Sequence, residues 1–287
     1  MAILHFRKRT PAVLFKYLDV AGAWNTLRPD GWASVMFSRP DRFNDPFECF
    51  PAGLKLESDG NLRRTIVRVL KEHEKEARAE CAKLGWQFEQ VVEDFRSGRR
   101  SLEPHRSAIL KSDGRGFQEA FAKTSGILSL SACHDHLAMW SYYAHNHEGL
   151  VLGFRTRAFL PLEVYPVEYS RKRPRLGETT DRDSIRKFTV KAPVWRHERE
   201  WRVVASSEYM KICRVFRGLP DWTDERILWE IEPANIDCVL LGVRCRDPSL
   251  LNRIAQFSAG SPLCRVLQAQ QDRRKFKLNF INWRTNK

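Results

Sequence analysis

The stretch from Ile127 to Phe154 places the tightest limits on the fold of this chain. It reads ILSLSACHDHLAMWSYYAHNHEGLVLGF. The alternating apolar residues of 127–131 predict a strand, and the aromatic segment 139–145 predicts a short helix. Gly149 then marks a turn, and a second apolar strand is predicted from Leu150 onward. A strand, a polar loop, a helix and a strand within so few residues predict one wall of a binding cleft.

The remaining segments predict strands in the centre and at the end of the chain, with helices near the front. Strands are expected at 11–18, 33–38, 162–169, 200–204, 228–231, 239–243, 266–271 and 276–281. Helices are expected at 21–27, 60–97 (broken at Gly85), 184–191 and 247–258, with a mixed linker at 97–115. Strand and helix do not alternate regularly, so we predict an α+β fold with a mostly antiparallel core. We expect a single domain over residues 1–287, with a helical insertion near residues 60–125.

The charge and the cysteines bear on the partners and the compartment. The formal net charge is +14, which favours a polyanionic partner such as nucleic acid, or an anionic small substrate. Seven cysteines, an odd number, match no disulfide framework, and reduced thiols in a cytoplasm are the simplest interpretation. No apolar run is long enough to span a membrane and no secretory signal is visible, so we expect a cytoplasmic protein with no membrane partner.

Two glutamates are the first candidates for chemistry. In an extended strand, Glu198 and Glu200 would lie on one face together with Arg202. One carboxylate could position a nucleophile while the other stabilises positive charge at a sugar carbon. The alternative is a structural role, in which the glutamates pair with Arg196, Arg199 or Arg202 at a sheet rim.

Aromatic and histidine side chains give two further hypotheses. Trp140, Tyr142 and Tyr143 could stack on a planar base or a nicotinamide, or they could pack in the core. Adjacent tyrosines on a helix point in different directions, so one can face the core and the other a cleft. The Asn44-Asp45-Pro46 segment is a turn former, although Asp45 and Glu48 could face a ligand. Metal ligands could come from a final group of residues, but no well-known zinc spacing occurs among them: Cys133, His134, His136, His145 and His147.

Taken together, these segments resemble a widespread bacterial family of unknown function, the domain-of-unknown-function family twenty-nine seventy-one. The resemblance rests on FKY at 15–17, FSRPDRFNDPFE at 37–48, MWSYYAHNHEGLVLGF at 139–154, VEY at 167–169, WRHEREWR at 195–202 and LLG at 240–242. The matching segments cover most of the chain in order. The family's layout is similar to the ADP-ribosyltransferase fold, so the resemblance implies that fold, with a split antiparallel sheet.

The same resemblance implies roles for individual residues. An early strand would hold NAD through Lys16 and Tyr17, and a middle strand and helix would supply Ser129, Ser131 and Tyr143. A late strand would carry Glu198 and the catalytic Glu200. Trp140 and Asn44 are further candidates for contacts with NAD, and no metal is implied.

The function implied is NAD-dependent ADP-ribosyl transfer by a bacterial toxin or phage-defence effector. The acceptor would be nucleic acid or protein, and an antitoxin partner would neutralise the activity. The alternatives are a non-catalytic basic nucleic-acid-binding module and a metal-dependent nuclease that uses the histidines and Asp135.

Overall fold

A computed structural model describes residues 9–50, 58–111, 125–174, 181–206 and 227–283 of the chain. These residues form two compact units. The first unit holds residues 9–49, 125–172 and 188–283, and the second holds the described residues within 50–117 and 173–187. The two units were predicted to form a single domain, and this stays a prediction. Within the described residues, no helix combines the length and apolar character needed to cross a bilayer.

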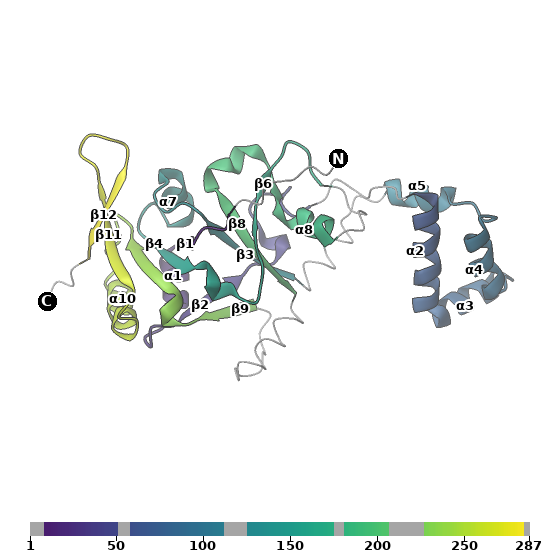
Figure 1. Cartoon of the computed structure of the whole chain (residues 1–287), viewed down its shortest axis with the longest axis horizontal. Coiled ribbons are helices and arrows are strands. Elements are labelled where there is room, and N and C mark those ends of the chain that lie inside the picture. Colours follow the sequence, from purple (N-terminus) through teal and green to yellow (C-terminus); the bar gives the residue numbers. More distant parts are fainter. Residues whose placement is uncertain (1–8, 51–57, 112–124, 175–180, 207–226, 284–287) are drawn as a thin grey trace. The chain divides into compact units, whose positions relative to one another are not determined.

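The first unit is built on an eight-stranded sheet with the order β12-β11-β10-β4-β1-β3-β8-β5 (Figure 1). Neighbouring strands are antiparallel, except that β10 and β11 are parallel. The strands are β1 (Val13–Leu18), β3 (Ser125–Ser131), β4 (Leu150–Arg155), β5 (Val164–Pro166), β8 (Glu200–Ser206), β10 (Ile236–Leu241), β11 (Arg265–Gln271) and β12 (Leu278–Asn282). The prediction of an α+β fold with a mostly antiparallel sheet is therefore confirmed.

Smaller elements complete this unit. Strand β2 (Ala33–Phe37) pairs with β9 (Ile227–Ile231), and β6 (Glu168–Tyr169) pairs with β7 (Val190–Lys191). Among the described residues, its α-helices are α1 (Val20–Thr26), α7 (Leu137–Tyr143) and α10 (Pro248–Gly260), and β7 directly follows α8 (Asp181–Thr189), most of which belongs to the second unit. The described part of this unit also holds four 3-10 helices, η1 (Pro40–Arg42), η2 (Thr156–Phe159), η3 (Pro193–Glu198) and η4 (Pro233–Asn235). The predicted strand, helix and strand between 127 and 154 are thus present as β3, α7 and β4.

Both faces of the central strands are covered, which explains the unbroken apolar run in β4. Leu150, Leu152 and Phe154 belong to one buried cluster, while Val151 belongs to another. The first cluster includes side chains from α1 and α10, and the second includes Met139 of α7. Figure 1 shows α7 on one side of these strands and α1 and α10 on the other. A strand buried on both faces needs apolar side chains at every position and not only at alternate ones.

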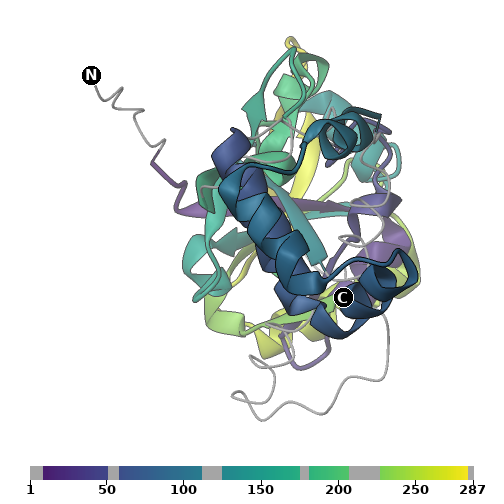
Figure 2. The same cartoon turned by 90° about the vertical axis from the view of Figure 1, so that its right-hand side faces the viewer.

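The second unit is helical. It contains α2 (Asp59–Glu72), α3 (Glu74–Lys83), α4 (Phe88–Ser97) and α5 (Glu103–Lys111), visible in Figures 1 and 2, together with residues 181–187 of α8. Its small core includes Leu62 and Val67 of α2 with Phe88, Val91 and Phe95 of α4. Its packing surfaces match the helical spacing of the apolar residues in the sequence.

Two details of this unit differ from the sequence prediction. The segment 60–97 holds three helices where two were expected, because the chain already leaves the helical conformation at His73 before it turns at Gly85. The segment 97–115 was expected to be a linker, but it contains α5. Pro104 lies at the start of α5, where its missing N–H costs no helical hydrogen bond. Residues 112–124, the last part of the predicted insertion, lie outside the described residues.

Candidate functional site

Three neighbouring strands bring the predicted polar residues together. β1, β3 and β8 lie side by side, and Ser131 pairs with Phe15 of β1 and with Glu200 of β8. Lys16 donates a hydrogen bond from its ammonium group to the Ser129 carbonyl oxygen at 3.1 Å. The Ser129 side chain also hydrogen-bonds the Glu200 carboxylate. The site is therefore organised by sheet pairing between residues that are far apart in the sequence.

Glu198 reaches the site by a route that differs from the prediction. It is the last residue of η3, and only Glu200 and Arg202 lie on β8. Arg199 between the two glutamates has a left-handed conformation, with φ of 46°. Strand alternation therefore does not apply to Glu198, and the prediction that it shares a strand face with Glu200 is wrong. The backbone is held here by the Ser131 hydroxyl, which donates to the Glu198 carbonyl oxygen at 2.6 Å.

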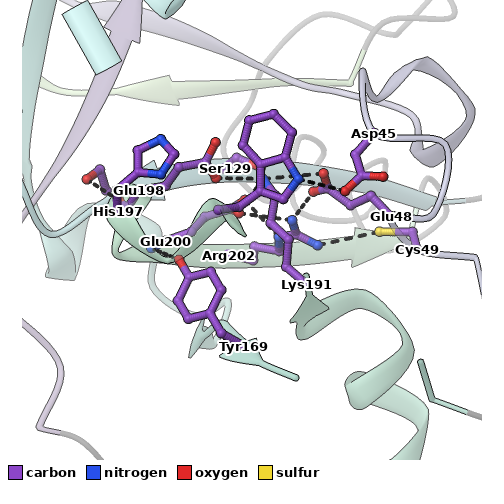
Figure 3. A network of polar contacts seen from close by, with 12 residues as sticks. Asp45, Glu48, Cys49, Ser129, Tyr169, Lys191, His197, Glu198, Glu200 and Arg202 are labelled. Atoms are coloured by element: carbon purple, nitrogen blue, oxygen red, sulfur yellow. Dashed lines mark hydrogen bonds and ion pairs between the residues drawn. The ribbon is translucent and has the colours of Figure 1, made fainter. Parts of the chain in front are cut away.

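A buried ion network surrounds the two glutamates (Figure 3). The Lys191 ammonium group lies 2.6 Å from Glu198 Oε2, 3.0 Å from Glu200 Oε2 and 3.3 Å from Glu48 Oε2. Arg202 donates to both carboxylate oxygens of Glu200, at 2.8 and 3.0 Å. It also donates to the Glu48 carboxylate and to the Phe188 carbonyl oxygen. The network thus joins three carboxylates to two cations.

Within the network, the pKa values of Glu200 and Glu48 are shifted in opposite directions. Burial alone would raise the pKa of Glu200, but the adjacent Arg202 and Lys191 outweigh it and hold the pKa at about 2. Burial raises the pKa of Glu48, and Arg202 only partly opposes the effect. The pKa values of Lys191 and Arg202 are raised despite burial, because Glu200 favours their charged forms. Glu200 is therefore a fixed anion, whereas Glu48 takes up a proton more readily than an ordinary glutamate.

Partly exposed side chains border the network. The Tyr143 hydroxyl of α7 donates to Glu198 Oε1 at 2.6 Å, and the Asn44 side chain hydrogen-bonds the same tyrosine. The Tyr169 hydroxyl accepts from the Glu200 backbone N–H at 2.8 Å. Burial raises the pKa of Tyr143, and Glu198 adds to that shift, so its hydroxyl stays protonated and acts as a donor. Tyr143, Asn44, Lys16 and Ser129 are thus the predicted residues that border the network with partly or fully exposed side chains.

Two other predicted residues lie in a different environment. The Tyr17 hydroxyl donates to the Cys133 carbonyl oxygen at 3.0 Å, and Trp140 Nε1 donates to the His134 carbonyl oxygen at 2.8 Å. The two rings pack edge to face with centroids 5.7 Å apart, within the cluster that α7 forms on the sheet. Trp140 is fully buried, so direct contact with a ligand would require the surrounding chain to move. Their contact with NAD stays a prediction.

Sequence reasoning missed Lys191, although it contacts all three carboxylates. It lies in the two-residue strand β7 after α8, and nothing in its local sequence distinguishes it from a surface lysine.

The Asn44-Asp45-Pro46 turn was predicted from the sequence, and the structure shows which contacts it makes. Asp45 accepts a hydrogen bond from Trp195 Nε1 at 2.8 Å, and the Lys191 ammonium lies 5.1 Å from the centre of the Trp195 ring.

The histidine-rich loop has its own contacts. Cys133 Sγ lies 3.0 Å from Asp135 Oδ1, and the rings of His136 and His197 stack at 5.1 Å. Among the described residues, no three His, Cys, Asp or Glu side chains are grouped so that they could hold a metal ion.

Comparison with known proteins gives no match. No family model matches the chain, and no curated protein or solved structure matches it.

Proposed function

We propose that the protein is an NAD-dependent ADP-ribosyltransferase of the resembled bacterial family, acting as a toxin or phage-defence effector. The observation that carries this proposal is the adjacency of β1, β3 and β8. The ADP-ribosyltransferase fold requires an early strand, a middle strand followed by a helix, and a late strand with a glutamate. In this chain the corresponding residues Lys16, Ser129 and Glu200 lie on neighbouring strands, and Tyr143 of the following helix reaches Glu198.

The charge state of Glu200 supports an electrostatic role. In the proposed reaction the bond between nicotinamide and the ribose carbon breaks, and its electron pair leaves with nicotinamide. The ribose is left as an oxocarbenium-like cation, which the acceptor attacks with loss of a proton. A carboxylate with a pKa of about 2 is a poor base near neutral pH, but it is a permanent negative charge. Glu200 would stabilise the cation, while Glu198, held by Tyr143, would orient the acceptor. Both side chains are buried, so these roles require the surrounding chain to move when NAD binds.

The test measures nicotinamide release and label transfer from NAD, with bulk RNA, DNA and cell lysate as acceptors. We expect release by the wild type and its loss in Glu200→Gln. Glu163→Gln, which removes an exposed carboxylate from the same unit, is the matched control and should leave the rate unchanged. Failure of the wild type to bind NAD would exclude the transferase.

A second candidate function is the non-catalytic nucleic-acid-binding module. The observation that favours it is the ion pairing of Glu198 and Glu200, which gives both glutamates a structural role. In that case Glu200→Gln lowers the free energy of unfolding, and a folded Glu200→Gln protein retains the nucleic-acid affinity of the wild type. Binding that depends on Glu200 in the folded protein would argue against the module.

A further inference from the structure

The helical unit contains a basic hollow of its own. Helices α2 and α4 border a hollow of about 550 Å³. The lining residues are Gly60, Arg63, Arg64, Val67, Arg68, Lys71, Glu72 and Arg96, all of which belong to this unit. We define these residues as the α2–α4 hollow.

Positive charge is concentrated in the hollow. It is lined by five Arg and Lys side chains and one acidic side chain, Glu72. The whole segment 58–111 carries twelve Arg and Lys residues against nine Asp and Glu residues, so outside the hollow the two signs nearly balance. A hollow with such an excess of positive charge attracts an anionic ligand more strongly than the unit as a whole does.

The cations of the hollow divide into one that is fixed and four that are exposed. Arg63 donates to the carbonyl oxygens of Phe95 and Arg100, at 3.2 and 2.9 Å, and so holds α2 against the end of α4. The exposed cations are Arg64, Arg68 and Lys71 of α2, and Arg96 of α4.

The three exposed cations of α2 form a row. Arg64, Arg68 and Lys71 follow each other at helical spacing on one face and span about 10 Å of the helix axis. Arg68 pairs with Glu72 only at 3.9 Å, and both side chains are well exposed. Such a surface pair is weak and exchanges readily for a phosphate group.

The same unit carries an exposed aromatic ring. The Trp86 side chain is 47% exposed, and the guanidinium group of Arg100 lies 4.2 Å from the centre of its ring. The carbonyl oxygen of Arg100 accepts a hydrogen bond from Arg63, so Arg100 joins the Trp86 ring to a residue that lines the hollow. A row of cations and an accessible aromatic ring in one small unit match the chemistry of single-stranded nucleic acid, whose phosphates are anionic and whose bases stack.

We propose that the α2–α4 hollow binds single-stranded nucleic acid, with its backbone along Arg64, Arg68 and Lys71 and a base on Trp86. An acidic peptide would use the cations but not the aromatic ring. Binding at this hollow does not depend on the transfer reaction, and it is measured without NAD.

The test uses the full chain and a labelled oligo-dT strand, with affinity measured by fluorescence anisotropy over a range of salt concentrations. We expect Arg68→Gln/Lys71→Gln to lower the affinity roughly 10-fold or more near 0.1 M salt. The slope of log affinity against log salt should fall by about 1.4, because each phosphate contact to a single strand contributes about 0.7. The matched control is Lys75→Gln/Lys83→Gln, which removes the same charge from exposed positions of α3 and should have less than half of the effect on the slope. Equal losses in the two double variants would overturn the site.

A second comparison tests the aromatic ring and the class of ligand. Trp86→Leu should weaken oligo-dT binding about five-fold or more and leave binding of a duplex of the same length unchanged. An unchanged affinity of Trp86→Leu for oligo-dT would overturn the proposal. A competition experiment gives a second outcome that would overturn it. If poly-glutamate displaces the labelled oligo-dT as well as unlabelled oligo-dT does at an equal concentration of negative charge, the hollow binds acidic chains in general.

Discussion

The ammonium group of Lys191 lies 2.6 Å from the Glu198 carboxylate, and both side chains are almost completely removed from solvent. The same ammonium group is within ion-pair distance of Glu48 and Glu200. One lysine therefore holds together a turn near residue 48, the end of η3 and the start of β8. The free energy of a buried charge depends strongly on its partners, so changes to this contact should have measurable effects on stability.

Removal of the Lys191 charge should destabilise the protein severely. Lys191→Met leaves three buried carboxylates: Glu48 and Glu200 keep their ion pairs with Arg202, and Glu198 keeps the hydrogen bond from Tyr143. Breaking a buried pair from one side costs about 3–5 kcal/mol in the free energy of unfolding. Urea unfolding measures the change, and Lys172→Met, at an exposed position, is the matched control with an expected effect within about 0.5 kcal/mol. Similar small changes in both variants would contradict the structural importance of the network.

Adjacent tyrosines provide a second matched pair. Tyr143→Phe removes the hydroxyl that donates to Glu198, whereas Tyr142 is 66% exposed. A hydrogen bond to a charged group contributes about 1.5–3 kcal/mol, and we expect a loss near the lower value because Tyr143 is only half-buried. Tyr142→Phe should leave the free energy of unfolding unchanged. If the proposed transferase function is correct, Tyr143→Phe also lowers nicotinamide release, whereas Tyr142→Phe does not. Equal effects of the two variants on the free energy of unfolding would show that the Tyr143 hydroxyl contributes nothing to stability.

The ion network should make the stability of the fold depend on pH in the acidic range. Glu200 has a pKa of about 2 in the folded state, compared with roughly 4.3 for an unfolded glutamate. Because the folded value is lower, Glu200 stabilises the fold above about pH 4.3 and loses that contribution as the pH falls toward 2. The full contribution is on the order of 3 kcal/mol. The raised pKa of Glu48 acts in the opposite direction, so it partly offsets the pH dependence of stability.

A carboxyl titration followed by NMR checks this directly. The signal that disappears in Glu200→Gln should remain that of an ionised group at roughly pH 3.5, where exposed glutamates are mostly protonated. Titration of that signal near pH 4.3 would show that Lys191 and Arg202 do not hold the Glu200 carboxylate.

Close backbone approach at Gly149 gives a packing prediction. A Cβ atom at Gly149 would lie 2.0 Å from the Leu18 carbonyl oxygen, next to the start of β4. Gly149→Ala should therefore cost about 3 kcal/mol in the free energy of unfolding. At Gly60, in the first turn of α2, a Cβ atom meets nothing within 4 Å. Gly60→Ala should be neutral or stabilising by up to about 1 kcal/mol in thermal unfolding, and a comparable loss at both positions would contradict the steric explanation.

The segments that local patterns could predict were those with their own periodicity. The apolar alternation of β3, the apolar run of β4 and the helical spacing of α2 are properties of neighbouring residues, so the sequence predicts them. The secondary-structure predictions were wrong where local sequence signals for different structures compete. The α-helical conformation ends at His73 without a proline or a glycine, and α5 begins within a stretch that contains residues typical of linkers.

The candidate site was predictable only in part. Ser129, Ser131, Glu200 and Tyr143 could be selected because they lie on recognisable elements and resemble a family pattern. Lys191 could not be selected, because its role arises from contacts with Glu48, Glu198 and Glu200 and not from its sequence neighbours.

The class of fold and the kinds of side chain available to the site follow from the amino-acid sequence, because hydrophobic periodicity and residue chemistry are local properties. Only the tertiary structure decided the order of the strands, the left-handed residue that turns Glu198 into the network and the buried position of Lys191. The physical reason is that ion pairing and burial depend on distances between residues far apart in the chain, and those distances exist only once the sheet has formed.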